Sequence, residues 1–144
     1  MYPVYPAIIR TLDFTLLGPI APIGFRVRLV YLPGNPFCVR ACFPGTLTVD
    51  GADARWEFSR DLLTEGLTAA SGEGDVHVGP VGAQLTGFHL RTALGCAELT
   101  TATGPLRAFL RATYELVPRG RERLDVDWDG LLAGGRTDDP QEPR

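Results

Sequence analysis

Hydrophobic and polar residues alternate along much of the first 60 positions of this 144-residue chain. Apolar side chains occupy positions 8, 12, 14 and 16, and polar side chains occupy positions 11, 13 and 15. Residues 25–31 and 37–43 alternate in the same way, with an expected inward face made of Phe25, Val27, Leu29, Tyr31, Phe37, Val39, Ala41 and Phe43. A period of two is typical of a strand with one buried face. The pattern therefore predicts three successive strands, over residues 8–16, 25–31 and 37–43.

The next segment, residues 46–66, combines a predicted hairpin with a short helix. Asp50 and Gly51 suit the positive φ angles of a two-residue hairpin turn, so the flanking residues 46–49 and 52–58 are predicted strands. Ser59 can accept a hydrogen bond from the first turn of a helix, and Asp61 suits the positive end of the helix dipole. We expect Leu62 and Leu63 to face inward and Gly66 to end this helix.

The second half of the chain repeats the order of strands followed by a helix. Residues 68–74 predict a flexible loop, and strands are predicted at 75–78, 84–91 and 96–101. Pro105 suits the first turn of a predicted helix over residues 105–117. Its apolar stripe is Leu106, Phe109, Leu110, Tyr114 and Val117, and its polar face is Arg107, Arg111 and Glu115. Residues 124–133 predict a short final helix.

These elements predict a single-domain α+β protein of two strand-rich halves, each a meander covered by the helix that follows it. The chain length fits one domain with a core of its own. We expect residues 1–7 to be an extended segment, residues 8–133 to form the domain, and residues 134–144 to be a disordered tail.

The charge balance argues against non-specific binding to nucleic acid. The net charge is −3 and all 14 basic residues are Arg, whereas neutralising phosphates needs a basic excess. Arg26, Arg28 and Arg40 share a predicted outer face, but the aromatic residues of these strands point inward and cannot stack on bases. Binding of single-stranded nucleic acid through this sheet stays open as an alternative. The chain shows no run of 18 apolar residues and no secretory leader, so we expect a cytoplasmic protein.

The sequence offers little chemistry for catalysis or metal binding. Cys38 and Cys42 lie four positions apart on one predicted strand, about 13 Å along the chain, which is too far to share a metal ion. We expect them and Cys96 to be free thiols. His77 or His89 could pair with a thiol, but no cysteine starts a helix or belongs to a C-x-x-C motif. A cysteine-dependent enzyme or redox sensor is therefore the least favoured alternative, and we expect no catalysis, cofactor, metal or small-molecule substrate.

Several blocks of the chain resemble the SsgA-like proteins, which regulate sporulation and cell division in filamentous actinobacteria. The segments "NPFCVRACF", "WEFSRDLLTEGL" and "GEGDVHVGP" resemble the family patterns D-P-Y-x-V-x-A-x-F, W-x-F-x-R-D-L-L-x-E-G-L and G-x-G-D-V-x-V-W-P. The segment "PLRAFLRATYELVPRGRE" resembles A-x-x-F-L-x-R-T-x-x-x-V-P-x-G-x-E, and "LDVDWDGLLA" resembles the closing L-D-x-D-x-x-L. Asn35 stands where the pattern has Asp and Gly79 where it has Trp, and residues 81–104 match poorly.

The resemblance implies a fold similar to the Whirly-type nucleic-acid binders, with two ββββα halves and assembly as a homotrimer. It also implies a non-catalytic adaptor, concentrated at division septa, that localises or recruits FtsZ or a membrane-associated division factor. The candidate contacts for such a partner lie on the expected exposed faces of the two helices. They are Arg60 and Glu65 on the first helix, and Arg107 and Arg111 on the second.

Overall fold

A computed structural model describes residues 6–47, 51–93 and 95–123 of the chain. The first half of this part contains β1 (Ile8–Leu17), β2 (Pro22–Tyr31), β3 (Cys38–Phe43), a 3₁₀ turn at Gly45–Leu47, β4 (Ala54–Ser59) and α1 (Arg60–Gly66). The second half contains β5 (Ser71–Glu73), β6 (Val76–Val81), β7 (Leu85–Thr92), β8 (Gly95–Ala102) and α2 (Thr103–Leu116). Most predicted strands and both predicted helices within these ranges are therefore present.

The strands form one continuous antiparallel sheet in the order β4-β3-β2-β1-β8-β7-β6-β5. The prediction of two separate strand-rich halves, as a Whirly-like ββββα repeat, is wrong. Residues 14–16 of β1 pair with residues 99–101 of β8, so a strand of the first half hydrogen-bonds to a strand of the second half and merges the two. The sheet is thus a single structural unit, with β1 and β8 at its centre.

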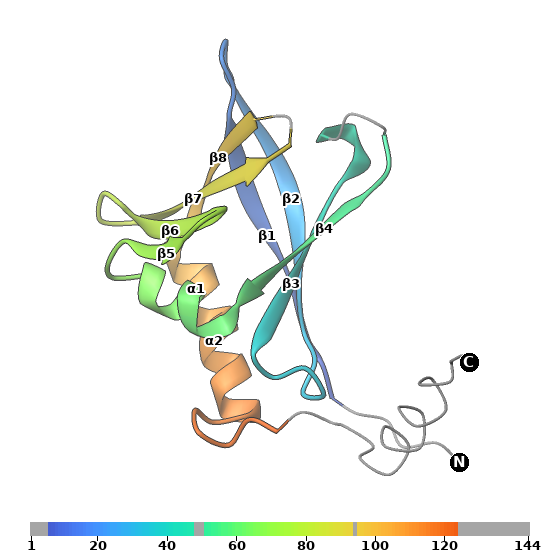
Figure 1. The fold of residues 1–144 in the computed structure, drawn as a ribbon, viewed down its shortest axis with the longest axis vertical. Coiled ribbons are helices and arrows are strands. Elements are labelled where there is room, and N and C mark those ends of the chain that lie inside the picture. Colours follow the sequence, from blue (N-terminus) through green and yellow to red (C-terminus); the bar gives the residue numbers. More distant parts are fainter. Residues whose placement is uncertain (1–5, 48–50, 94, 124–144) are drawn as a thin grey trace, which may run out of the picture.

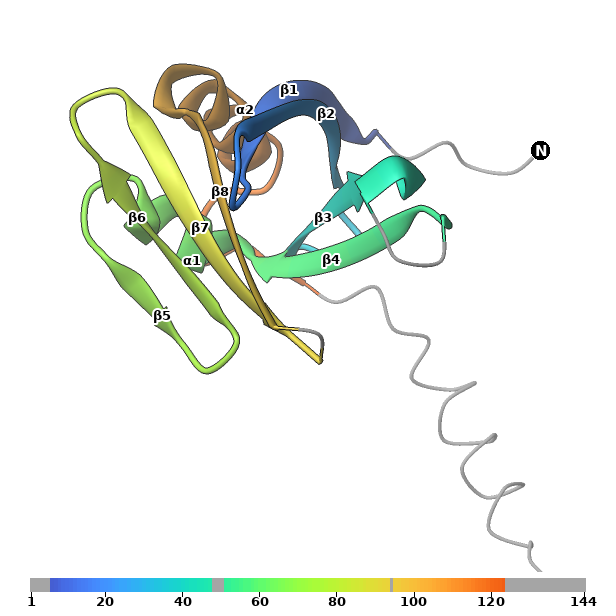
Figure 2. The same ribbon diagram turned by 90° about the horizontal axis from the view of Figure 1, so that it is seen from above.

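This sheet is curled into a half-barrel (Figures 1 and 2). Phe58 on the edge strand β4 and Phe88 on β7 are separated by several strands in the sheet order, yet their ring centroids are only 5.6 Å apart. Phe14 on β1 meets Phe88 as well, with centroids 5.4 Å apart. Such contacts require the two wings of the sheet to bend towards each other. The aromatic residues of the concave face therefore make a shared core.

Each helix packs against strands of both halves, which is a second reason why the two-unit prediction fails. α1 follows β4 but also contacts β5 and β6, and α2 follows β8 but also contacts β1. Gly66, the last residue of α1, lies so close to β6 that a Cβ atom there would collide with the side chain of Val78. Its role is therefore close packing, since the residue after it, Leu67, keeps a right-handed helical conformation.

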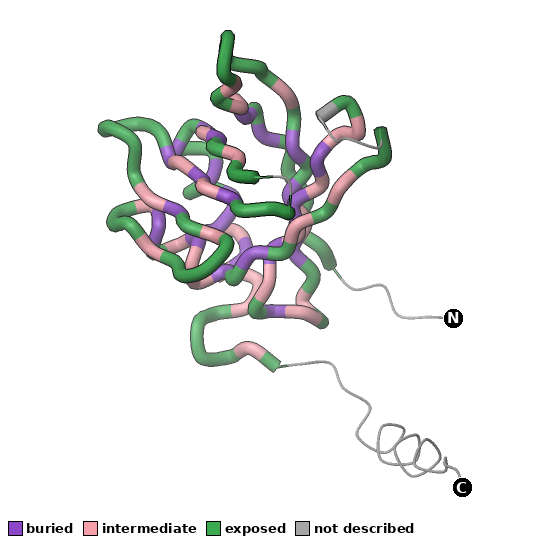
Figure 3. Tube along the Cα trace, turned by 45° about the horizontal axis from the view of Figure 1, so that its top comes forward, coloured by how far each residue is buried: buried purple, intermediate pink, exposed green. Residues whose placement is uncertain are grey.

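Buried and exposed positions alternate along the strands, as the sequence pattern predicts (Figure 3). The core cluster includes buried residues from both halves and both helices, among them Val27, Val39, Phe88, Leu63 and Phe109. One expected core residue, Phe37, precedes β3 and is 47% exposed. We call the sheet face opposite α1 and α2 the open face.

Several local predictions need correction. Residues 45–47 form a 3₁₀ turn rather than the first strand of a hairpin, and β4 pairs with β3 instead. Residues 71–73, which the sequence assigns to a loop, form β5 and pair with β6. The predicted turn residue Asp50, the segment 1–5, the final helix over 124–133 and the tail 134–144 lie outside the described residues.

Candidate interaction surfaces

Arg60, a predicted contact residue, lies in the interior of the protein. Its side chain is 1% exposed and donates hydrogen bonds to the backbone carbonyls of Thr113 (3.1 Å) and Val117 (2.9 Å). It also donates to the Glu122 carboxylate at 2.9 Å. α2 has no basic residue in its last turn, so Arg60 supplies the positive charge that the negative end of this helix favours.

Two aromatic rings enclose the Arg60 guanidinium. It lies 4.0 Å from the ring centroid of Tyr114 and 5.0 Å from that of Tyr31, distances typical of cation–π contacts. The Nε atom has no hydrogen-bond partner among the described residues. The rings and acceptors around the remaining nitrogens compensate for removing this charge from water.

A second set of contacts joins the same two helices. The Tyr114 hydroxyl donates to Asp61 Oδ1 at 2.7 Å and shares a hydrogen bond with the Thr64 hydroxyl at 2.9 Å. Arg119, just after α2, forms an ion pair with Asp61 at 3.1 Å. Asp61 thus contacts both Tyr114 and Arg119. It also lies in the first turn of α1, where the helix dipole favours a negative charge. Ser59 caps that turn as predicted, by accepting from the Leu62 amide at 3.2 Å.

The ionisable groups around Arg60 respond to this environment. The pKa of Glu122 is lowered from 4.5 because the carboxylate accepts hydrogen bonds from its own backbone N–H and from that of Gly120, and because Arg60 stabilises its charge. Burial raises the pKa of Tyr31, although the Arg60 charge opposes the shift. Burial likewise raises the pKa of Tyr114. Near neutral pH the tyrosines are therefore uncharged rings around an Arg–Glu ion pair.

The exposed position that we expected for Arg60 is therefore wrong, and the sequence contained a signal for its burial. Residues three and seven positions apart on a helix share a face, and Leu63 and Leu67 follow Arg60 at those intervals. Leu63 is buried and Leu67 is partly buried. Glu65, five positions after Arg60, points elsewhere on the helix and is exposed.

The other candidate contact residues lie at the surface. Arg107 and Arg111 are exposed, one turn apart on α2, and neither forms an ion pair with another described residue. The structure does not unite the four predicted residues into one site, because Arg60 is enclosed. A role in partner binding stays a prediction for Glu65, Arg107 and Arg111.

The open face of β2 and β3 carries the expected arginines. Arg26 lies 3.6 Å from Asp13, and Arg40 lies 3.4 Å from Glu57. Arg28 is the cross-strand neighbour of Cys42. Because two of these arginines face carboxylates, the basic character of this region is partly neutralised. Phe25 and Phe43 lie on the opposite face, within or against the core cluster, as the alternation predicts.

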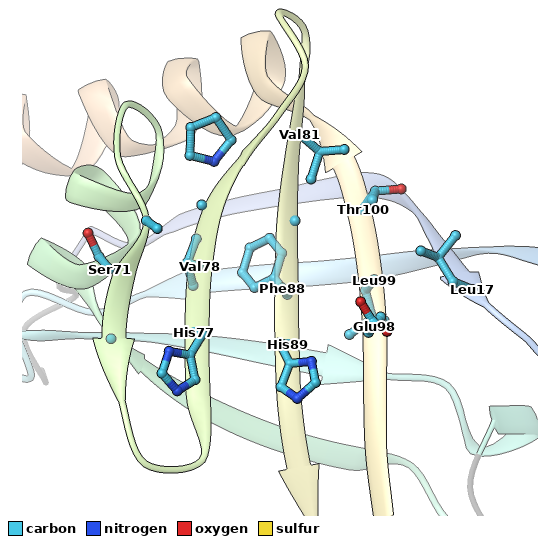
Figure 4. A pocket seen from close by; sticks show the side chains of 15 residues that line it. Leu17, Ser71, His77, Val78, Val81, Phe88, His89, Glu98, Leu99 and Thr100 are labelled. Carbon is cyan, nitrogen blue, oxygen red and sulfur yellow. The ribbon is translucent and has the colours of Figure 1, made fainter.

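The open face of β6, β7 and β8 contains a hollow of about 430 Å³ (Figure 4). Its lining includes the cross-strand partners Gly79 and Gly87, and Thr100 beside them. Ala70 lies over Gly79, and the Val81 side chain lies over Gly87. Leu17 and Val81 stand at its border. Gly79 is the position at which the family pattern has Trp, so this departure from the pattern lies in the lining of the hollow.

A polar row borders the hollow on the side away from Val81 (Figure 4). His77 pairs with His89, and His89 pairs with Glu98. The two imidazole rings have centroids 6.4 Å apart. The sequence placed His89 on a solvent-facing side but gave no indication that His77 would lie beside it, because the register of β6 against β7 is a tertiary property.

Metal and thiol chemistry find little support in the described part of the chain. Within residues 6–47, 51–93 and 95–123, no group of three His, Cys, Asp or Glu residues is placed to hold a metal ion. Cys38, Cys42 and Cys96 are free cysteines, as expected. Burial, followed by the charge of Glu57, raises the pKa of Cys38. None of the helices in these ranges is long and apolar enough to span a membrane.

Comparison with known proteins gives consistent matches. A sequence model of the family "Streptomyces sporulation and cell division protein, SsgA" matches residues 25–122. The sporulation-specific cell division protein SsgB of Thermobifida fusca is 35% identical over 78% of this chain and 82% of its own length. SsgB of Kineococcus radiotolerans is 39% identical over 83% of this chain and 72% of its own length.

Solved structures agree with the sequence matches. The crystal structure of an SsgA-like sporulation-specific cell division protein from Thermobifida fusca superposes with a TM-score of 0.76 at 33% identity, over 94% of this chain and 99% of its own. A structure from a study of SsgB mutations and longitudinal cell division in Streptomyces coelicolor gives a TM-score of 0.74 at 28% identity, over 85% and 97% of the two chains. Sequence and fold therefore show that this chain belongs to the SsgA family of sporulation and cell division proteins.

Proposed function

We propose that this protein acts in cell division during sporulation as a non-catalytic adaptor, concentrated at division septa. The observation that carries the proposal is the family match over residues 25–122, together with relatives named sporulation-specific cell division proteins. In this role the protein localises or recruits a division protein, such as FtsZ or a membrane-associated division factor. It works as a homo-oligomer, and the family resemblance favours a trimer.

The structure supports an adaptor by the way it holds its helices. Buried contacts around Arg60 and the network around Asp61 fix α1 against α2. The outer faces of both helices consequently form a firm surface, which carries Glu65 on α1 and Arg107 and Arg111 on α2. A pre-ordered surface loses little conformational entropy on binding. We therefore assign the partner contact to these exposed helix faces.

The test combines localisation with direct binding. A fluorescently tagged copy should mark septa in sporulating hyphae of the source organism, and purified protein should co-sediment with FtsZ polymers or with a division-membrane protein. The double charge reversal R107E/R111E should reduce this binding about tenfold or more and leave the unfolding temperature nearly unchanged, since exposed positions contribute little to stability.

The matched control is Arg55→Glu, which reverses an exposed charge on β4, away from the helices. It should retain both localisation and binding. A protein that stays diffuse through septation and binds no division protein would contradict the adaptor proposal. Loss of binding in Arg55→Glu but not in R107E/R111E would move the contact from the helices to the sheet.

A further inference from the structure

Four exposed arginines on α2 and just after it have no ion-pair partner among the described residues. Arg107 and Arg111 lie one turn apart on the helix, and Arg121 and Arg123 lie on the segment that follows it. We call these four residues the α2 arginines. The carboxylate that α2 itself contributes is Glu115. Positive charge therefore exceeds negative charge along this part of the surface, and such a surface favours an acidic partner.

The chain divides its charge between the folded body and the residues beyond it. The described residues contain twelve arginines and ten Asp or Glu residues, which gives them a net charge of +2. Residues 124–144 contain two arginines and six carboxylates, which gives them a net charge of −4. Asp50 completes the total of −3. The six carboxylates are Asp125, Asp127, Asp129, Asp138, Asp139 and Glu142. A basic body and an acidic segment of one chain attract each other.

The acidic segment starts at a fixed place beside the end of α2. Glu122 accepts hydrogen bonds from Arg60 at 2.9 Å and from the Gly120 backbone N–H at 2.7 Å, and its side chain is 8% exposed. These contacts hold the segment that follows α2 against the two helices, directly below α2 (Figure 1). The carboxylates of residues 124–144 therefore begin within a few positions of Arg121 and Arg123.

The spacing lets the first carboxylates reach back along the helix. An extended chain covers at most about 3.5 Å per residue, so Asp125 and Asp129 lie at most about 7 and 21 Å from residue 123. A helix rises about 1.5 Å per residue, so Arg111 and Arg107 lie about 8 and 14 Å before the last residue of α2. The acidic segment is therefore long enough to run back over both arginines.

We propose that residues 124–144 bind the α2 arginines of the same molecule through their carboxylates and cover the exposed face of α2. A tethered segment meets its site at a roughly millimolar effective concentration, so several individually weak surface ion pairs are enough to populate the contact. The inference deepens the proposed function and rests on it in one respect, because Arg107 and Arg111 are also assigned to the division partner. The acidic segment therefore competes with that partner, whose own contact surface is acidic.

The chain's own segment fits these arginines better than an anionic membrane does. Anionic headgroups attract basic residues that lie within about a Debye length of the surface. The same field repels residues 124–144, which the chain ties to the arginines. The net charge of −4 on this segment cancels the charge of the four α2 arginines, which leaves no net attraction to an anionic surface.

Trp128 provides a probe of the contact because it lies between Asp127 and Asp129 in the sequence. The chain has two tryptophans, so the full-length variant Trp56→Phe reports on Trp128 alone. In this background the fluorescence anisotropy of Trp128 should be high at low salt and its quenching by acrylamide slow. Raising the salt concentration from about 0.1 M to about 1 M shortens the Debye length from about 10 Å to about 3 Å. It should therefore lower the anisotropy and speed the quenching.

The decisive variant is R107Q/R111Q in the Trp56→Phe background. Losing two surface charge pairs should lower the equilibrium constant of docking about threefold or more, with the same change of signal as high salt. The matched control R26Q/R91Q removes the same charge from exposed positions on β2 and β7 and should keep the wild-type signal. Circular dichroism should show that both variants remain folded, because all four arginines are exposed.

Two outcomes would overturn the docking and leave the adaptor proposal untouched. One is an anisotropy that R107Q/R111Q does not change, or that R26Q/R91Q changes equally. The other is an anisotropy that falls on dilution, because the contact would then join different molecules.

A second measurement separates the competition from the docking. The full-length variant D125N/D127N/D129N keeps the α2 arginines and removes three carboxylates of the acidic segment. The apparent affinity of a site scales with the fraction of molecules in which it is free, so this variant should bind FtsZ polymers or a division-membrane protein about threefold more tightly than wild type. Equal affinity, with docking shown by Trp128, would overturn the competition. If neither protein binds a division partner while Trp128 reports docking, the partner contact proposed for the helices is wrong and the docking stands.

Discussion

The Arg60 guanidinium lies 2.9 Å from the Glu122 carboxylate, and this ion pair joins the first turn of α1 to the segment that follows α2. The two residues belong to two separate blocks of the family pattern, R-D-L-L and V-P-x-G-x-E. Gly120 of the second block has a φ of 87° and donates its backbone N–H to Glu122 at 2.7 Å. Both blocks therefore supply residues to one structural contact. This contact accounts for the family pattern at these positions, and no reaction chemistry is needed to explain it.

Replacing Arg60 should destabilise the protein strongly. Arg60→Met keeps much of the side-chain length but removes the cationic partner of Glu122 and one donor to each of the Thr113 and Val117 carbonyls. Removing one member of a buried ion pair costs about 3–5 kcal/mol, and urea denaturation would measure the loss. The control Arg107→Met, at an exposed position on α2, should change stability by less than about 0.5 kcal/mol. Equal small effects for both variants would contradict the buried position of Arg60.

The Glu122 contact should make stability depend on pH in the acidic range. Its folded-state pKa is below 4.5, so its contribution is fully present above about pH 4.5 and is lost as the pH falls through the lower folded-state pKa. Glu122→Gln cannot lose a proton. The stability difference between wild type and Glu122→Gln should therefore be largest near neutral pH and shrink below pH 4.5. Urea titrations at several pH values would measure this stability difference. A difference that stays constant with pH would contradict the lowered pKa of Glu122.

Two glycine-to-alanine changes in helices should have opposite signs. Ala generally stabilises a helix over Gly by about 1 kcal/mol. At Gly66, however, the added methyl group would collide with Val78, and overpacking costs about 1–3 kcal/mol. Gly104 in α2 has open space within 4 Å of where a Cβ atom would lie, so Gly104→Ala should raise the unfolding temperature and Gly66→Ala should lower it. Stabilisation by both would show that α1 does not lie this close to β6.

The sheet should not bind single-stranded nucleic acid. The rings of Phe14, Phe58 and Phe88 lie together in the core, so they are not available for stacking on bases. Fluorescence anisotropy with an oligonucleotide of about 20 nucleotides at low salt should show no saturable binding at micromolar protein concentrations. Micromolar affinity with a steep salt dependence would support the alternative that the sequence left open.

The three thiols should react at different rates. Cys96 is exposed, whereas Cys38 is half-buried and burial raises its pKa. Because the thiolate is the reactive form, an alkylating reagent at mildly alkaline pH should modify Cys96 well before Cys38, as mass spectrometry of peptides would show. Cys96→Ser should remove the fast phase alone. Faster labelling of Cys38 than of Cys96 would support an activated thiol at Cys38.

The features that the sequence predicted correctly are those that depend on residues close together in the chain. Ser59 caps α1 because its hydroxyl needs only an amide three positions away, and the alternation of β2 and β3 identified their buried faces. The pairing of β1 with β8 was missed because it joins residues from opposite ends of the domain. β5 was missed because Ser71–Glu73 is short and small, and becomes a strand by pairing with β6. Arg60 was misplaced because a charged residue was assumed to be solvated, although helical periodicity put it beside Leu63.

The pairing of β1 with β8 has a consequence for biosynthesis. β1 occupies the centre of the sheet, but one of its two neighbours consists of residues 95–102, which leave the ribosome only after most of the chain has been made. Until then an edge of β1 is unpaired, and unpaired strand edges invite association with other chains. The first half of the nascent chain therefore cannot fold stably before β8 has been made. We expect a chain truncated before residue 102 to be unstable and prone to aggregation.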